Sequence, residues 1–205
     1  MIAANSDSAA LTAQADIYRF YVTVIRPALA EFAFTADVVG EETTDLDVFF
    51  ERARVNTHNA LCYEMRRTFA LIIAALFERQ LRTWLSGKLP TATTKIDKIR
   101  EWKDLFKRVD QVDGAILTDD LRADLDELRS VANAVRHGSE KSVDEVLKAA
   151  PHFWDQARAR PDSRWQSDLV GNMRIPDARL ERYTRAVLEF WHLAGASSLI
   201  PGVGN

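Results

Sequence analysis

Apolar and polar residues follow one another along this chain with the three- and four-residue spacing of amphipathic helices, and few stretches alternate as strands do. The first pattern predicts a helix over about residues 9–36, with apolar positions at Tyr18, Val22, Ile25 and Leu29. Pro27 should kink or divide this helix, because proline lacks the N–H group that an interior position donates. The polar residues 40–45 then predict a loop.

A second helix is predicted over residues 47–86. Its stretch 69–85 is apolar on most sides, which is typical of a helix in the middle of a bundle. Gly87 should end this helix, and Pro90 prevents its continuation.

Four more helices are expected, with irregular chain over residues 152–176 and a tail over 197–205. They are an amphipathic helix from Thr94 or Lys95 to Val112, one capped by Thr118 that ends at His137, a short one capped by Ser142, and a last one over 177–196. The fold class is therefore predicted to be an all-α, up-and-down helical bundle of about five or six helices. Residues 1–45 should pack on the bundle 46–197, and 198–205 should be a tail.

The composition is that of a soluble globular protein, with 47% apolar and 28% charged residues in 205. The N-terminus lacks the basic and apolar regions of a signal peptide, and the longest apolar run is far short of the roughly 20 residues of a membrane span. A single cysteine, Cys62, favours a reducing compartment. We therefore expect a cytoplasmic protein that does not enter a membrane.

The net charge is only −3, but the charges are unevenly spread. Residues 66–108 contain eleven Lys and Arg against four Asp and Glu, whereas residues 109–150 contain five against ten. A basic block beside an acidic one indicates a polyanion-binding face, two helices that pair with each other, or solvated helix surface.

The end of the helix that stops at Gly138 contains the strongest candidate site. Arg129, Asn133 and His137 follow at four-residue steps on one side of the helix, and Arg136 lies on its flank. The apolar positions of this helix form the stripe that should be buried, with Arg129, Asn133 and Arg136 on its flank: Leu121, Leu125, Leu128, Ala132 and Val135. A cation, an amide and an imidazole on one side suit phosphate chemistry, although basic residues are also common in the last turn of a helix for structural reasons.

At these residues the chain resembles the HEPN superfamily of helical nucleotide-binding and ribonuclease domains. The resemblance rests on residues 131–138 (VANAVRHG), residues 74–82 (AALFERQLR) and the number of helices, over roughly residues 56–194. Residues 142–147 (SVDEVL) and 151–154 (PHFW) are similar to an uncharacterised bacterial branch of this superfamily.

The resemblance implies a homodimer whose motifs face each other across a cleft, and RNA cleavage that needs no metal. A histidine then assists proton transfer, and an arginine stabilises charge on the phosphate. Asn133 and His137 match this motif, but Ala132 stands where the arginine is expected and should point into the core. Arg129 and Arg136 are the cations nearest to that position.

The sequence therefore predicts an RNA-directed protein of a bacterial stress or defence system, such as toxin–antitoxin or antiviral defence, acting as a metal-independent endoribonuclease. The predicted catalytic residues are His137, Asn133, Arg136 and Arg129. No cofactor is expected, and the scattered histidines argue against a metal site. Two alternatives stay open: an inactive helical dimerisation or interaction module with a protein partner, and an anion- or nucleotide-binding domain.

Glu78 is the unusual polar residue of the apolar stretch 69–85. It could pair with Arg82 one turn later, or reach into the cleft of the motif.

Overall fold

The computed structural model of this chain describes residues 3–36, 46–89, 96–154 and 170–195. Within these residues all regular structure is helical, which confirms the predicted all-α bundle. The elements are α1 (Ala3–Phe20), a π-helical turn (Tyr21–Ile25), α2 (Arg26–Glu31), α3 (Leu46–Lys88), α5 (Trp102–Val112), α6 (Asp119–His137), α7 (Glu140–Ala149), a 3₁₀ turn (Pro151–Phe153) and α9 (Asp177–Leu193).

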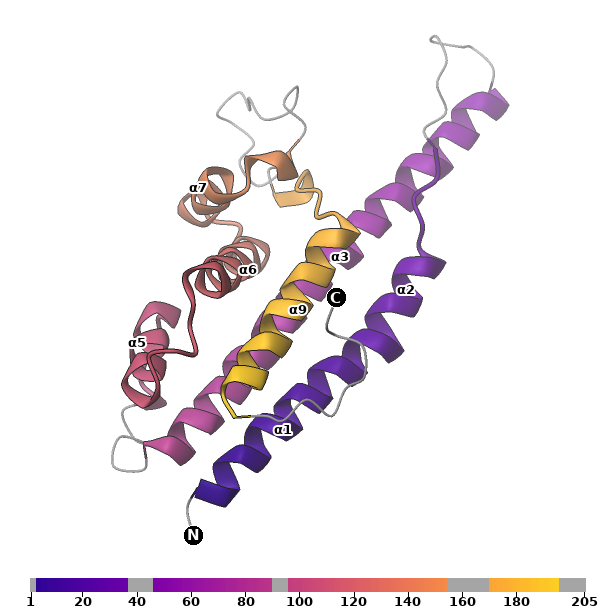
Figure 1. Cartoon of the computed structure of the whole chain (residues 1–205). Coiled ribbons are helices and arrows are strands. Elements are labelled where there is room, and N and C mark those ends of the chain that lie inside the picture. The colour runs from indigo at the N-terminus through magenta and orange to yellow at the C-terminus, as the bar shows by residue number, and fades with distance from the viewer. Residues whose placement is uncertain (1–2, 37–45, 90–95, 155–169, 196–205) are drawn as a thin grey trace.

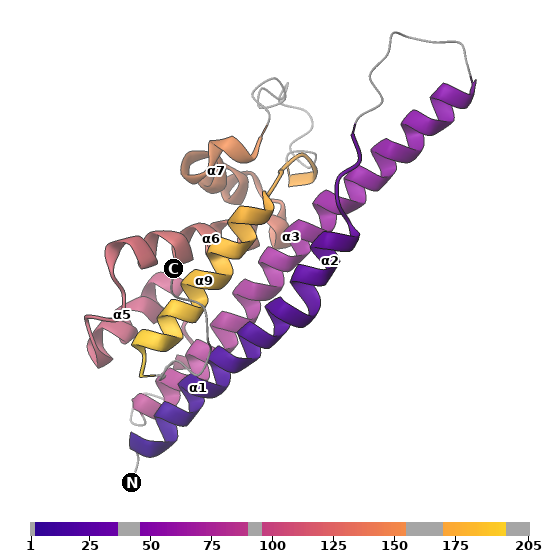
Figure 2. The same ribbon diagram turned by 45° about the vertical axis from the view of Figure 1, so that its right-hand side comes forward.

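The helices α3 and α9 form the middle of the bundle. α1 lies along one side of this pair and runs antiparallel to α3, whereas α9 runs parallel to α3 (Figures 1 and 2). α6 packs against the other side of α3 and α9, and α5 and α7 flank it. Ala10, Ala13 and Ile17 of α1 are buried in the same core as α3 and α9, so the N-terminal helix shares that core.

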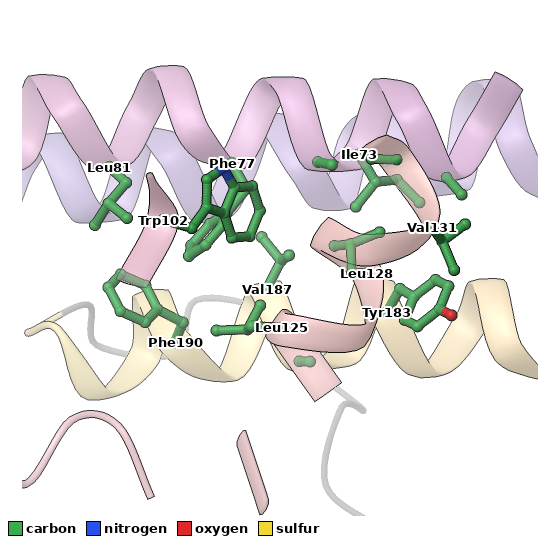
Figure 3. Close-up of a cluster of buried hydrophobic side chains, with 14 of the residues drawn as sticks. Ile73, Phe77, Leu81, Trp102, Leu125, Leu128, Val131, Tyr183, Val187 and Phe190 are labelled. Carbon is green, nitrogen blue, oxygen red and sulfur yellow. The ribbon is translucent and has the colours of Figure 1, made fainter. Parts of the chain in front are cut away.

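The centre of the core is aromatic. Phe77 of α3 is fully buried, and its ring meets the rings of Trp102, Phe190 and Trp191 edge-on at centroid distances of 5.4, 5.0 and 5.9 Å. Figure 3 shows Leu125 and other apolar side chains of α6 entering the same space between α3 and α9. As predicted, the apolar stretch of α3 lies inside the bundle.

The N-terminal rod, formed by α1, the π-helical turn and α2, changes from α-helical to π-helical winding before Pro27. The N–H of Arg26 donates to the carbonyl of Tyr21, five residues back, and Pro27 follows in the first turn of α2, where its missing N–H costs no helical bond. The predicted effect of Pro27 therefore takes the form of a π-helical turn.

The predicted end of this first helix was wrong. The rod begins at Ala3 and ends at Glu31 rather than near residue 36, because side chains of α3 hold the backbone that follows. His58 Nε2 lies 2.9 Å from the carbonyl of Ala33, and the amide of Asn59 makes two bonds to the backbone of Thr35, at 3.0 and 2.9 Å. These bonds replace the helical ones.

The predicted start of the helix that ends at Val112 was also wrong, because α5 begins only at Trp102. Ile96 and Trp102 are both buried, and α3 anchors both: Arg82 donates to the carbonyl of Ile96, and the indole of Trp102 donates to Glu78. In one continuous helix these two residues would point about 120° apart, so both could not face α3.

Three further boundaries differ from the sequence prediction. α3 continues through Gly87 to Lys88, so Gly87 does not end it. α7 is capped by Ser139 rather than Ser142, because the Ser139 hydroxyl accepts the N–H of Ser142 and the helix starts earlier. α9 ends at Leu193. The predicted loop 40–45 and tail 198–205 lie outside the described residues, as does most of the irregular connection 152–176.

Candidate functional site

The helix α6 places the predicted site residues through its two ends. Thr118 caps its start, with the hydroxyl accepting the N–H of Leu121, and Gly138 ends it in the left-handed conformation at φ 57°. Both signals were predicted from the sequence. A glycine ends a helix well because it tolerates positive φ better than any other residue. His137 is therefore the last helical residue, and its side chain is exposed.

The structure brings all four predicted residues together. His137, Arg136, Asn133 and Arg129 line one pocket of about 290 Å³ at the junction of α6 and α7. His137 and Arg136 are exposed, and Asn133 and Arg129 are partly buried. The sequence analysis placed Arg129, Asn133 and His137 on one side of this helix, and all three line the same pocket.

Ala132 lies on the buried stripe of α6, about 40° from Arg136 and about 140° from His137 around the helix. It is 3% exposed, in contact with the core, and Leu125 and Leu128 of the same stripe are fully buried, while Val135 is partly buried. A side chain at position 132 therefore faces other helices rather than the pocket. The charge at the pocket has to come from other positions.

The two arginines of α6 that line the pocket, Arg129 and Arg136, differ in their interactions. Arg129 Nε lies 3.5 Å from Asp126 Oδ1, an ion pair that occupies part of its guanidinium. Burial raises the pKa of the Asp126 carboxyl, although the charges of Arg129 and Arg122 act in the opposite direction. Arg136 makes no hydrogen bond or ion pair with any described residue, and its exposed side chain lines the pocket beside Glu78, whose pKa its charge lowers.

Glu78 of α3 forms the wall opposite α6. Its carboxylate accepts from Arg82 at 2.6 Å and from the indole N–H of Trp102 at 3.0 Å, and it also lines the pocket. Both sequence interpretations of Glu78, the pairing with Arg82 and the position in the cleft, therefore hold. Burial would raise the pKa of this carboxyl, but the bonds from Arg82 and Trp102 and the charge of Arg136 outweigh burial and lower the pKa.

The pocket contains further cations that motif reasoning did not single out. Arg100 comes from the turn before α5, and Lys141 comes from the first turn of α7. Only the charge imbalance of residues 66–108 pointed toward Arg100. Its position was not predictable, because it depends on the non-helical chain between Ile96 and Trp102.

A second, larger hollow of about 620 Å³ adjoins this pocket and shares Glu78 and Arg136 with it. It extends along α3 past Arg79 and Arg82. The two hollows together form a surface with arginines from α3, the α5 approach and α6. Two acidic residues of α6 pair with α9 instead: Asp124 with Arg182 and Glu127 with Arg179.

No group of three or more His, Cys, Asp or Glu with metal-binding geometry occurs within the described part of the chain. Cys62 is buried, with its sulfur 3.5 Å from His58 Nε2, on the side of α3 that holds residues 33–35. None of the described helices is both long and apolar enough to cross a membrane.

In comparisons with known proteins, no family model, no curated protein and no solved structure matched this chain.

Proposed function

We propose that this protein is a HEPN-like, metal-independent endoribonuclease of a bacterial stress or defence system, and that RNA binds at the pocket around His137. The observation that carries the proposal is the meeting of an exposed histidine, an amide and an exposed arginine, Arg136, in one pocket. Arg100 and Lys141 join Arg129 and Arg136 around it, beside the carboxylates of Glu78, Glu101 and Glu145, and the small excess of positive charge favours an RNA backbone.

RNA supplies its own nucleophile, so the reaction needs proton transfer and charge stabilisation rather than a metal-bound water. The ribose 2′-oxygen attacks the adjacent phosphorus as the bond from phosphorus to the 5′-oxygen breaks. His137 takes the proton of the 2′-hydroxyl or returns one to the leaving 5′-oxygen. Arg136 stabilises the charge on the phosphate, supported by Arg129, and Asn133 orients the ribose or the histidine.

The test is cleavage of single-stranded RNA by the purified protein in the presence of a chelator. We expect products ending in a 2′,3′-cyclic phosphate, and no cleavage when the attacking 2′-hydroxyl is replaced by hydrogen. His137→Ala should abolish cleavage while leaving the thermal midpoint nearly unchanged, because the side chain is exposed. Arg136→Ala should lower the rate on the order of a hundredfold.

His192→Ala is the matched control, since His192 is also an exposed histidine in the last turn of a helix. It should cleave like the wild type. Equal loss of cleavage in both variants, or unfolding of His137→Ala, would contradict the proposed role of His137.

The burial of Ala132 favours one alternative. A core alanine stands at the position where the resembled motif has its charge-stabilising arginine, which is expected of an interaction module that kept the fold and lost the chemistry. Such a module would bind a protein partner or an anion such as a nucleotide without cleaving RNA. Lack of cleavage together with saturable, His137-independent binding would support this alternative.

A further inference from the structure

The hollow of about 620 Å³ that adjoins the His137 pocket is lined by three segments of the chain. α3 supplies most of the lining, the turn before α5 supplies Asp97, and α6 supplies Arg136, which lines both hollows. Binding pockets for small molecules usually have volumes of about 300–1,000 Å³. The hollow can therefore receive one nucleotide beside the nucleotide at His137.

The side of α3 that lines this hollow is the exposed sector of a helix that is otherwise largely buried. Arg79 and Thr83 are one turn apart and exposed, whereas Phe77, Leu81 and Leu85, on other sides of the helix, are fully buried. The exposed sector therefore presents a long cation and a hydroxyl to the hollow.

The charges of the hollow leave an excess at one place. Its lining contains three arginines and two carboxylates, but Arg82 donates to Glu78 at 2.6 Å and to the carbonyl of Ile96 at 3.0 Å. That pair holds the chain before α5. Arg79 makes no hydrogen bond or ion pair with any residue in the described part of the chain. Arg79 and Arg136 thus remain against the single carboxylate of Asp97.

We propose that this hollow is a subsite for the backbone of a single RNA strand, in which Arg79 binds the phosphate next to the one held in the His137 pocket. The identity of the ligand rests on the proposed function. Arg136 lines both hollows, so a strand that leaves the first pocket passes this arginine and follows α3. The carboxylate of Asp97 repels phosphate, so the backbone lies toward the arginines.

The lining also indicates which part of the RNA is contacted. Within the described residues it consists of arginine, carboxylate, hydroxyl and alanine side chains, with no aromatic ring on which a base could stack. Contacts to phosphate position a nucleic acid without reading its sequence. We therefore expect the subsite to favour longer strands over short ones and to tolerate different bases.

The experiment measures binding of a labelled single-stranded RNA of about ten nucleotides by fluorescence anisotropy. Every sample is the full chain with His137→Ala, so that cleavage does not consume the RNA. Adding Arg79→Gln should weaken binding roughly fivefold. It should also reduce the slope of log K against log salt concentration by about 0.7, the value for one phosphate contact with a single strand.

Two further variants separate a contact with phosphate from a structural effect. Asp97→Asn should strengthen binding roughly twofold, because it removes a negative charge beside the phosphate. Arg185→Gln is the matched control, since Arg185 is also an exposed arginine but lies on α9, outside both hollows. It should bind like the protein without it, with the same salt slope.

Strand length provides a second readout. A dinucleotide has one bridging phosphate, so it cannot occupy the His137 pocket and reach Arg79 at the same time. The difference in affinity between the proteins with and without Arg79→Gln should therefore largely disappear for a dinucleotide and return when the strand is lengthened.

The subsite would be overturned by an unchanged salt slope in Arg79→Gln, by an equal loss in Arg185→Gln, or by weaker binding in both Arg79→Gln and Asp97→Asn. Binding of an acidic peptide but not of RNA, with dependence on Arg79, would overturn it in favour of a protein partner. If the wild type does not cleave RNA but binding changes as expected, the subsite is supported and the ribonuclease reaction is contradicted. Cleavage by the wild type with unchanged binding in Arg79→Gln would do the reverse.

Discussion

The two halves of α3 have the same helical backbone and comparable apolar side chains, but opposite surroundings. In the inner part of α3, residues 62–88, Phe77, Leu81 and Leu85 are fully buried. In the outer part, residues 46–61 (the arm), Phe49 and Phe50 are more than half exposed. The reason is length. α3 has 43 residues and spans about 64 Å, while α9 has 17 and spans about 26 Å. Burial therefore depends on which helices reach a residue as well as on its hydrophobicity.

The boundary between the two halves is marked by buried charge. Arg66 is 1% exposed and bonds to Asp177 at the start of α9, while Arg67 is 4% exposed and bonds to backbone carbonyls of Gly171 and Met173. Lone arginines in a core are costly, so each finds several acceptors there. These bonds fix where the bundle ends and the arm begins.

The largest expected effect is a difference in unfolding free energy between the same substitution in the two parts of α3. Phe77→Ala should lower the free energy of unfolding by about 3–5 kcal/mol, because it empties the centre of the aromatic cluster. Phe49→Ala, the same substitution in the arm, should change it by less than about 0.5 kcal/mol in the monomer. Denaturant titration of both variants at low concentration measures the contrast. Similar losses would mean that the arm is part of the core.

A second experiment removes the bond between Asp177 and Arg66 at the boundary between the two parts of α3. Asp177→Ala should cost about 2–3 kcal/mol, because it takes a charged partner from the buried guanidinium of Arg66. Glu181→Ala is the control: Glu181 and its partner Arg185 are both more than half exposed, and their pair should contribute less than about 0.5 kcal/mol. Thermal unfolding of the two variants should rank them clearly, and equal midpoints would show that Arg66 is satisfied without Asp177.

The smallest effects concern two carboxyls near the pocket and have opposite signs. The native pKa of Glu78 is lowered, so its carboxylate stabilises the fold at neutral pH, and this contribution is lost as pH falls through the native pKa. Glu78→Gln should therefore cost about 1–2 kcal/mol at pH 7, with the difference from wild type shrinking in acid.

The native pKa of Asp126 is raised, so stability falls as pH rises from its unfolded to its native pKa. Asp126→Asn should then be more stable than wild type at pH 7, with this difference also shrinking in acid. Unfolding measured across acidic and neutral pH separates the two carboxyls, and effects of the same sign would contradict their assigned surroundings.

Local signals in the sequence predicted the part of the site that lies on α6. Thr118, Gly138 and the apolar stripe fix the ends and the orientation of this helix, and those choices place Asn133 and His137 on its accessible side. Each signal acts within a few residues, so periodicity and capping were sufficient.

The other wall of the pocket, formed by Glu78 of α3 and the chain before α5, could not be predicted in this way, because it depends on contacts between distant segments. The chain before Trp102 looks helical by its apolar spacing, yet the bonds from Arg82 to Ile96 and from Trp102 to Glu78 hold it in another conformation. The position of Arg100 follows from that choice. The same holds for residues 33–35, where tertiary bonds from α3 replace a predicted helix.

A single residue, Gly138, separates the last residue of α6 from Ser139, the N-cap of α7. A link of one residue allows little relative motion, so α6 and α7 should move together as one rigid unit that carries His137 at the junction of the two helices. Asn133 and Lys141 belong to this unit, whereas Glu78 and Trp102 belong to a second body formed by α3 and α5. The width of the pocket can therefore change when one body slides against the other, or when the turn before α5 that carries Arg100 moves.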